Sequence, residues 1–328
     1  MGLLQNLAYS MVPWQFAWTG LVSCACLVLL PVTSGAADPP VTAIAFAPDG
    51  ESVVLASQAG LSVHDWPDLN TVRQLSTTIV NIHDMEFSPD GGSLAVAGGT
   101  PAESGKAQIF AWPDGTSSCE LQGHDDSVLA IAWKDDSSIA TASLDHDIVV
   151  WDVTTRQPSE RLKGHSRGVS DLCFLNGYDL LVSSGLDQNL RVWKTESGKV
   201  IRTLNNHTKE VYGLALRPAT LGIPMIASVS NDRTVRLWQP TIGRMVRFAQ
   251  LNAIPLAAAW LADGSQVAVA ATDGYVRLID PDTVEVLETI PAVSGWAYSL
   301  AVHPGDGSLL VGGRSGQLKR IIIESSRR

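Results

Sequence analysis

The sequence predicts an all-β protein built from seven copies of one unit. Beyond residue 40, short apolar runs alternate with turn signals such as the Pro-Asp-Gly steps at 48–50 and 89–91, and helix-period patterns are absent. One order of features recurs along the chain: a Gly-His or Asn-His step, two strands joined by a turn, then Asp and Trp. Such repeats let a single domain occupy most of a 328-residue chain, because every copy adds the same unit to a shared core.

Three segments carry the repeat most clearly. They read GHDDSVLAIAW…IATASLDHDIVVWD, GHSRGVSDLCF…LVSSGLDQNLRVWK and NHTKEVYGLAL…IASVSNDRTVRLWQ. Four weaker copies replace the motif Trp by another residue, and the seven positions in order are His64, Phe110, Trp151, Trp193, Trp238, Ile279 and Ile321. Successive positions lie 41 to 46 residues apart. Because one four-stranded propeller blade uses about 40–45 residues, the copies predict a seven-bladed β-propeller over residues 38–328.

The three clear segments closely resemble the WD-repeat (G-protein β-subunit-like) family of β-propellers. The resemblance implies a buried structural network in each complete blade, which links a His, a Ser or Thr, an Asp and the motif Trp. Carried over residue by residue, these networks are His124, Thr141, Asp145 and Trp151; His165, Ser183, Asp187 and Trp193; and His207, Ser228, Asp232 and Trp238. The sixth copy keeps Asp273 but has Leu251 at the His position, and the first, second and seventh copies lack both His and Asp.

These networks contain the residue types of a hydrolase triad, but their pattern favours a structural role. A catalytic triad has no reason to occur three times in one chain at one spacing. The sequence also contains no P-loop, no G-x-S-x-G elbow, no H-E-x-x-H and no C-x-x-C pair. We therefore expect no enzyme activity, no cofactor and no metal site, and we interpret Asp145-His146-Asp147 as a turn.

The first 37 residues differ from the rest, since they contain no charged side chain and run almost continuously apolar from Met11 to Val32. Small residues at 33–37 before Asp38 predict a signal peptide cleaved after Ala37, and so export to the periplasm or secretion. Two alternatives stay open. Residues 11–32 are long enough for an uncleaved membrane anchor, and Cys24 lies in a segment similar to a lipobox.

Charge and cysteine content narrow the partners. The chain has 23 Lys and Arg against 33 Asp and Glu, a formal charge of −10, which is the wrong sign for binding nucleic acid. Beyond the leader only Cys119 and Cys173 remain, and the repeat places them on different blades, where we expect free thiols. Contact with a membrane is expected only through the N-terminal segment.

The family resemblance implies a non-catalytic scaffold that binds proteins or peptides at the loops of one rim. The candidate partner-binding residues on this chain are Arg167, Lys209, Arg233, Trp296 and Tyr298. The two aromatic residues are of the type enriched at binding hot spots. The alternatives are an accessory subunit of an envelope complex, and a ligand-binding or enzymatic propeller that uses the central channel, although no repeated acidic or His set is evident at the channel mouth.

The seventh copy raises the question of ring closure. In the WD-repeat family the start of the chain usually supplies the outermost strand of the last blade. Here Asp38-Pro39-Pro40 precede the first inner strand, which we expect to open at Val41, and proline cannot donate to a ladder. We therefore expect a three-stranded seventh blade with an exposed edge over residues 318–323. An uncut leader could instead place residues 29–33 there.

Overall fold

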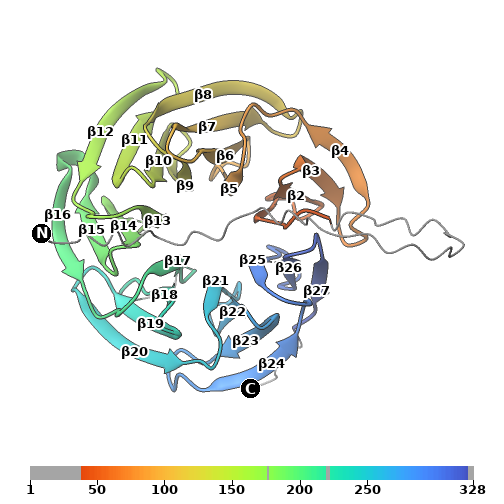
Figure 1. Ribbon diagram of the computed structural model, residues 1–328, viewed down its shortest axis with the longest axis vertical. Helices are drawn as coiled ribbons and strands as arrows, with labels where there is room; N and C mark the ends of the chain where they lie inside the picture. Colours follow the sequence, from red (N-terminus) through yellow and green to blue (C-terminus); the bar gives the residue numbers. More distant parts are fainter. Residues whose placement is uncertain (1–37, 176, 219–221, 324–328) are drawn as a thin grey trace, which may run out of the picture. The chain divides into compact units, whose positions relative to one another are not determined.

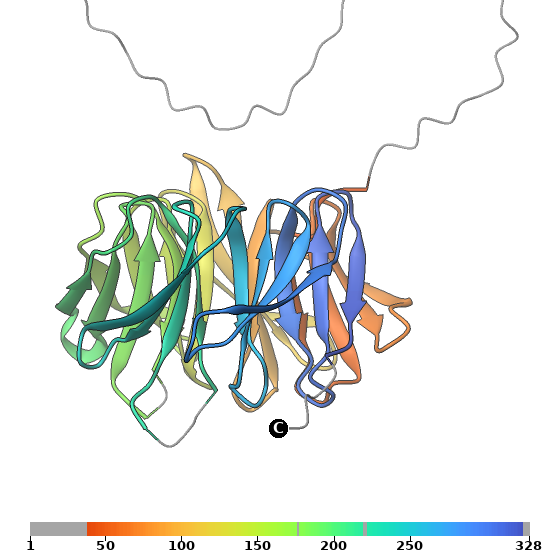
Figure 2. The same ribbon diagram turned by 90° about the horizontal axis from the view of Figure 1, so that it is seen from below.

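The computed structural model describes residues 38–323 except 176 and 219–221. Within these residues 27 strands form seven antiparallel sheets, six of four strands and one of three. The first strand of each sheet contacts the first strand of the next, and β25 contacts β1, so the sheets close into a ring (Figure 1). Figure 2 shows this ring from the side, with its strands running between the two ends. The predicted seven-bladed all-β propeller is confirmed.

We number the sheets as blades 1 to 7 in chain order, and in each the strands follow one another from the channel outwards. Blades 1 to 3 contain β1 (Ala43–Phe46), β2 (Ser52–Ser57), β3 (Gly60–Asp65) and β4 (Thr71–Leu75); β5 (Ile82–Phe87), β6 (Ser93–Thr100), β7 (Ser104–Ala111) and β8 (Thr116–His124); and β9 (Val128–Asp135), β10 (Ser138–Ser143), β11 (Asp147–Asp152) and β12 (Gln157–Lys163).

Blades 4 to 7 follow the same plan. Blade 4 also contains one short 3-10 helix, and blade 7 has three strands instead of four. They contain β13 (Val169–Phe174), β14 (Leu180–Gly185), β15 (Leu190–Lys194), η1 (Thr195–Ser197) and β16 (Lys199–Leu204); β17 (Val211–Leu216), β18 (Ile226–Ser230), β19 (Thr234–Gln239) and β20 (Arg244–Gln250); β21 (Pro255–Trp260), β22 (Val267–Ala271), β23 (Tyr275–Ile279) and β24 (Val286–Pro291); and β25 (Ala297–Val302), β26 (Leu309–Gly313) and β27 (Leu318–Ile321).

The motif Trp position marks the same irregularity in every four-stranded blade. All seven residues at this position lie on third strands, namely β3, β7, β11, β15, β19, β23 and β27. In the six four-stranded blades the register between the third and fourth strands shifts immediately before this residue. A bulge of this kind bends a strand and increases its twist. The motif position therefore marks where the pairing with the outer strand is irregular.

Each apolar layer is shared by two neighbouring blades. One cluster combines Ile109 and Leu121 of blade 2 with Val128, Trp133 and Ile139 of blade 3, all at most 6% exposed. A blade taken alone would leave such a face in water, so stability depends on stacking neighbouring units.

The junction between blades 7 and 1 corrects one expected boundary. The sequence suggests that the first inner strand opens at Val41, whereas β1 begins at Ala43. The Val41 N–H donates to the carbonyl of Gly313 at 3.2 Å, and its own carbonyl accepts from the Ser299 hydroxyl at 3.0 Å. Val41 therefore pairs with blade 7 instead of β2.

The predictions about the leader and about membrane contact concern residues that the structure does not describe. The signal peptide or anchor expected at residues 1–37, with Cys24, is not among the described residues. In the part of the chain that is described, no helix has the length and apolar character needed to cross a membrane. Cys119 on β8 and Cys173 on β13 are free cysteines.

Candidate functional site

Polar networks underlie one rim of the ring in blades 3, 4 and 5. In blade 3 the imidazole of His124 lies 2.8 Å from a carboxylate oxygen of Asp145 through Nδ1, and 2.8 Å from the Thr141 hydroxyl through Nε2. The indole N–H of Trp151 donates to the same hydroxyl at 2.8 Å. The four side chains therefore form one chain of hydrogen bonds from the core to the turn between the second and third strands.

Blades 4 and 5 repeat this geometry. His165 lies 2.9 Å from Asp187 and 2.7 Å from Ser183, to which the Trp193 indole donates at 2.8 Å. In blade 5 the corresponding distances are 2.8 Å between His207 and Asp232, 2.7 Å between His207 and Ser228, and 2.8 Å between the Trp238 indole and Ser228. The structure thus brings together all twelve residues that the resemblance assigns to the networks.

In blades 4 and 5 a neutral imidazole satisfies the contacts of the network. The indole N–H donates to the hydroxyl, the hydroxyl donates to Nε2, and Nδ1–H donates to the carboxylate. Burial lowers the pKa of His207 to about 4, against the opposing effect of Asp232. Burial likewise lowers the pKa of His165. Burial alone would raise the pKa of Asp187 and Asp232, but the hydrogen bonds that each carboxylate accepts hold both pKa values below their usual range.

Each network also fixes the loop that enters the blade. The backbone N–H of the residue after the motif His donates to the network carboxylate, at 3.1 Å for Asp125, 3.0 Å for Ser166 and 3.1 Å for Thr208. One Asp therefore connects the entering loop to the turn between the second and third strands. Loops of these two types carry the candidate partner-binding residues Arg167, Lys209 and Arg233.

The structure places three of the predicted partner-binding residues on these loops in blades 4 and 5. Arg167 precedes β13, Lys209 precedes β17, and Arg233 is at the turn between β18 and β19. Lys209 and Arg233 are exposed. Arg167 lies 3.9 Å from Glu210 of the neighbouring blade, which gives a loose ion pair between the two loops.

The two predicted aromatic residues lie together at the entrance of blade 7. The rings of Trp296 and Tyr298 meet edge to face at 5.7 Å. Trp296 is 39% exposed, so it does not fill the core in place of the missing motif His. Tyr298 is partly buried and also lines the central channel. The pair is therefore accessible from the rim and from the channel mouth.

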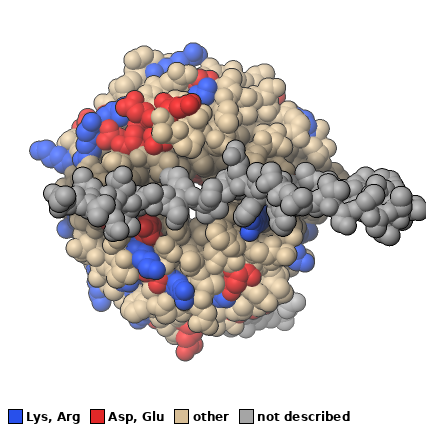
Figure 3. All heavy atoms as spheres, viewed as in Figure 1, with Lys and Arg blue, Asp and Glu red and all other residues tan. Residues whose placement is uncertain are grey.

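Charge on the face seen in Figure 1 is mixed. Figure 3 shows Lys and Arg side chains distributed around this face, and Asp and Glu side chains gathered mainly over blade 3. Asp125 and His146 of blade 3 are exposed, while Asp126 is half-buried and accepts the backbone N–H of Ala102 at 2.8 Å. No single sign of charge covers this face.

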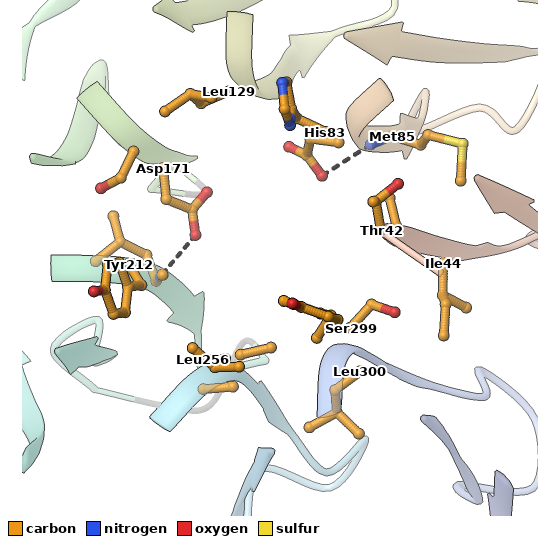
Figure 4. A pocket seen from close by; sticks show the side chains of 18 of the residues that line it. Thr42, Ile44, His83, Met85, Leu129, Asp171, Tyr212, Leu256, Ser299 and Leu300 are labelled. Carbon is orange, nitrogen blue, oxygen red and sulfur yellow. Dashed lines mark hydrogen bonds between the residues drawn. The ribbon is translucent and has the colours of Figure 1, made fainter. Parts of the chain in front are cut away.

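The central channel contains carboxylates that the sequence analysis missed. A cavity of about 480 Å³ is lined by side chains that include His83, Asp84, Glu86 and Asp171 (Figure 4). Asp84 accepts from the backbone N–H of Met85 at 2.8 Å and Ile131 at 2.9 Å. Because Ile131 belongs to the next blade, this carboxylate caps the free inner edge of β9.

Asp171 makes the same contact two blades further on. It accepts from the backbone N–H of Leu172 at 2.7 Å and of Leu214 in the next blade at 2.6 Å. Burial raises the pKa of Asp84 to about 6, and burial together with the charge of Asp84 raises the pKa of Asp171 to about 8. Glu86 lies at the channel wall, where its side chain is accessible. The surrounding protein displaces most of the water around its carboxylate, and this desolvation, together with the charges of Asp84 and Asp171, raises the pKa of Glu86 to about 8. Its carboxylate accepts the Trp133 N–H at 2.7 Å.

These acids connect neighbouring blades. Among the described residues, no three His, Cys, Asp or Glu side chains converge closely enough to hold a metal ion. The signal that could have found the two aspartates is positional, because Asp84 in IHDMEF and Asp171 in VSDLCF occupy the same place in the aligned first strands.

The fold, the three networks and the capped inner strands define the class of protein: a seven-bladed β-propeller that contains WD repeats. The family model "WD domain, G-beta repeat" matches residues 115–152, 156–194 and 198–239. Blades 3 to 5, which contain the three complete networks, are therefore WD repeats.

Curated relatives match over parts of their length. The nuclear distribution protein nudF of Aspergillus flavus is 34% identical over 140 residues, which cover 42% of this chain and 30% of that protein. GID complex subunit 7 of Schizosaccharomyces pombe is 32% identical over 202 residues, 58% of this chain and 38% of that protein. Periodic tryptophan protein 2 of Arabidopsis thaliana is 28% identical over 230 residues, 67% of this chain and 24% of that protein. The chain thus matches well under two thirds of these relatives.

Proposed function

We propose that this chain is a non-catalytic scaffold that binds protein or peptide partners at the rim above blades 3 to 5 and at the Trp296–Tyr298 pair. The observation that carries the proposal is the conformation of the rim turns. His146, Gln188 and Arg233 occupy the same turn position in blades 3, 4 and 5 with φ of 77°, 71° and 64°.

Side chains at this position are unfavourable for the fold. A non-glycine residue in the left-handed region is disfavoured by about 1–2 kcal/mol relative to the usual backbone regions. Blades 6 and 7 have Gly274 and Gly316 at this position. There a Cβ would meet neighbouring atoms at 2.1 and 2.4 Å. Blades 3 to 5 leave room for a side chain, and the strained residues there are exposed or carry long side chains, which supports a role outside folding.

The networks beneath these turns support the same proposal. A binding surface made of loops gains affinity when its loops are held in place before the partner arrives. In blades 3 to 5 one buried carboxylate holds both the turn and the entering loop. The rim above the complete networks is therefore the best preorganised part of this end of the ring.

The relatives support a role within assemblies. One of them is named as a subunit of the GID complex. The channel alternative has weaker support, because Asp84, Asp171 and Glu86 already accept backbone N–H groups and serve the contact between blades. An accessory subunit without a recognition surface of its own is the alternative that an experiment must separate.

A pull-down from the native membrane and envelope fractions tests the rim. The test variant replaces His146, Gln188 and Arg233 by glycine, which removes the side chains and keeps the turn conformation. Lys199→Ala, at an exposed position on the outer strand β16, is the matched control. We expect a specific partner to be retained by the control and lost from the triple variant. A partner held equally by both would contradict a rim site and favour an accessory subunit.

We further propose that the scaffold is exported after removal of residues 1–37, with anchoring by residues 11–32 as the alternative. The support is the uncharged apolar stretch followed by small residues at 33–37. Intact-mass measurement of the native protein should give a chain that starts at or near Asp38. A species that retains residues 11–32 in the membrane pellet would contradict cleavage.

A further inference from the structure

Blade 7 lacks an outer strand among the described residues. Blades 1 to 6 each have a fourth strand paired with the third, whereas β27 pairs only with β26. In Figure 1 the outer side of β27 lies at the perimeter of the ring, between β24 and β3. The other six blades show what a strand at this place contributes.

In those blades an apolar residue of the fourth strand covers the start of the third. The pairs are Leu61 with Leu75, Ala107 with Leu121, Ile148 with Leu162, Leu190 with Leu204, Val235 with Ala249, and Val276 with Ile290. The third-strand residue of each pair is at most 2% exposed. Leu318 is the equivalent residue of β27, and it is only half-buried. An aliphatic side chain opposite Leu318 would complete the pattern.

A hollow lies beside this uncovered position. A cavity of about 490 Å³ is lined by residues 291–294 and by residues 317–319 at the start of β27. The exposed Ile322 continues the apolar character beyond the end of the strand, at 70% exposure. The open edge therefore combines unpaired backbone groups with uncovered apolar side chains.

We propose that the outer edge of β27 binds an extended segment of a partner protein as the missing fourth strand. The segment runs antiparallel to β27, places one aliphatic side chain opposite Leu318, and carries an acidic side chain near Lys319 or Arg320. The binding groups are the outer edge of β27 and not the turns of blades 3 to 5 or the Trp296–Tyr298 pair, so the proposal goes beyond the scaffold function given above.

The charge of the edge selects a partner over a second copy of this chain. Lys319 is exposed, and Arg320 is half-buried with an ion pair to Asp306 at 2.9 Å. Two copies of β27 paired edge to edge would place these cations near one another, and like charges across a strand pair are destabilising. An acidic strand meets the same cations favourably.

The chain's own leader is the other competitor, because Asp38 lies against Gly316 in the turn before β27. In blade 4 the covering residue Leu204 lies nine residues before Gly213, the third residue of the next inner strand β17. In blade 6 Ile290 lies nine residues before Ser299, the third residue of β25. Ala43 is the equivalent residue of β1, and nine residues before it is Ser34, which offers no aliphatic side chain. Pro31 in this segment cannot donate to a ladder.

The probe is a synthetic peptide that copies residues 284–292 of this chain, VEVLETIPA. This segment contains β24, in which Ile290 covers Val276 and Glu288 lies opposite Leu278. On β27 the same register would place Ile290 opposite Leu318 and Glu288 opposite Arg320. Binding to the full chain is measured by fluorescence anisotropy, and the site is located by hydrogen exchange at the amides of residues 318–321.

We expect saturable binding that slows exchange at residues 318–321. Replacement of the peptide's Ile290 by Ser should weaken binding about tenfold or more, because an aliphatic side chain is no longer buried. Replacement of its Glu288 by Lys should weaken binding by about two- to fivefold. The protein variant Lys319→Glu should lower the affinity for the acidic peptide, and the triple-glycine rim variant should bind it unchanged.

Several results would overturn the proposal. The peptide could leave exchange at residues 318–321 unaltered, or the Ser-substituted peptide could bind equally well. Slow exchange in the isolated monomer, lost when residues 1–37 are removed, would assign the edge to the leader. Slow exchange that depends on protein concentration and accompanies dimers would assign it to a second copy. A failed rim pull-down with normal peptide binding would contradict the scaffold rim alone.

Discussion

Blades 3 to 5 and blade 2 solve the same packing problem with different chemistry. In blade 4 the indole of Trp193 is fully buried and its N–H is satisfied by Ser183. In blade 2 the equivalent Phe110 is also fully buried and has no polar group to satisfy. Both side chains fill the space between blades, so the apolar volume is what the fold requires. The polar network is an addition that holds the turn and loop above it.

Blades 1 and 2 carry aromatic clusters that the sequence analysis did not identify. Trp66 stacks on His303 of blade 7 at 5.0 Å, and Phe46 meets both rings edge to face. In blade 2, Trp112 meets Phe87 at 5.1 Å. Blades 1 and 2 therefore each place a Trp two residues beyond the motif position.

The largest effect should come from the apolar side of this contrast. Phe110→Ala should lower the free energy of unfolding by about 3–5 kcal/mol, because it removes a fully buried ring and leaves a cavity between blades. Urea unfolding followed by tryptophan fluorescence measures the change. Phe110→Leu is the matched control and should lose less than half as much. Equal losses would mean that the aromatic shape matters more than the volume.

Removal of a network carboxylate should have the next largest effect. Asp187→Ala strips the buried imidazole of His165 and the N–H of Ser166 of their acceptor, which should lower stability by about 1–3 kcal/mol. Asp273→Ala in blade 6 is the control, because Asp273 pairs with Arg277 without any motif His. Its loss should be under about 1 kcal/mol. If thermal melts of Asp187→Ala and the parent coincide, the network contributes nothing to the fold.

Acid should weaken the contribution of a blade with a polar network to the stability of the fold. Burial lowers the pKa of His207 to about 4, from about 6.5 in the unfolded chain, so the unfolded state binds the extra proton between these values. Stability from this residue is present above pH 6.5 and is lost as the pH falls towards 4. His207→Gln removes the titrating group, so its unfolding free energy should depend less steeply on pH over this range.

The carboxylates of the channel change the unfolding free energy with pH in the opposite direction, but they do so equally in the parent protein and in His207→Gln. The raised pKa of Glu86 and Asp171 favours the folded state below pH 4, and this contribution is lost as the pH rises through about 8. Both proteins share it. Denaturant unfolding at several pH values between 4 and 7 gives the two slopes, and identical slopes would mean that His207 is not held neutral by burial.

The sequence predicts what depends on local, repeated signals. The motif Trp positions follow from a spacing that recurs along the chain, and the twelve network residues follow from the resemblance of three segments to the WD-repeat family. The channel acids were missed because Asp84 and Asp171 are significant only when the first strands of different blades are aligned and their contact to the next blade is known. The aromatic clusters had a signal, the Trp-Pro-Asp triplets at 66–68 and 112–114, but their partners come from strands and blades that spacing alone does not bring together.

The smallest expected effect concerns the rim turns and has the opposite sign. Gln188→Gly should raise the free energy of unfolding by up to about 1 kcal/mol, because φ at this position is 71° and glycine adopts this value without strain. Gln188→Ala keeps a Cβ and should bring no such gain. Differential scanning calorimetry of the three proteins resolves the difference as a shift in Tm. A gain in Tm together with loss of a partner would indicate that the side chain is retained for binding at the expense of stability. A lower Tm for Gln188→Gly would mean that the side chain stabilises the turn, and the strain at the rim would then give no support to a binding role.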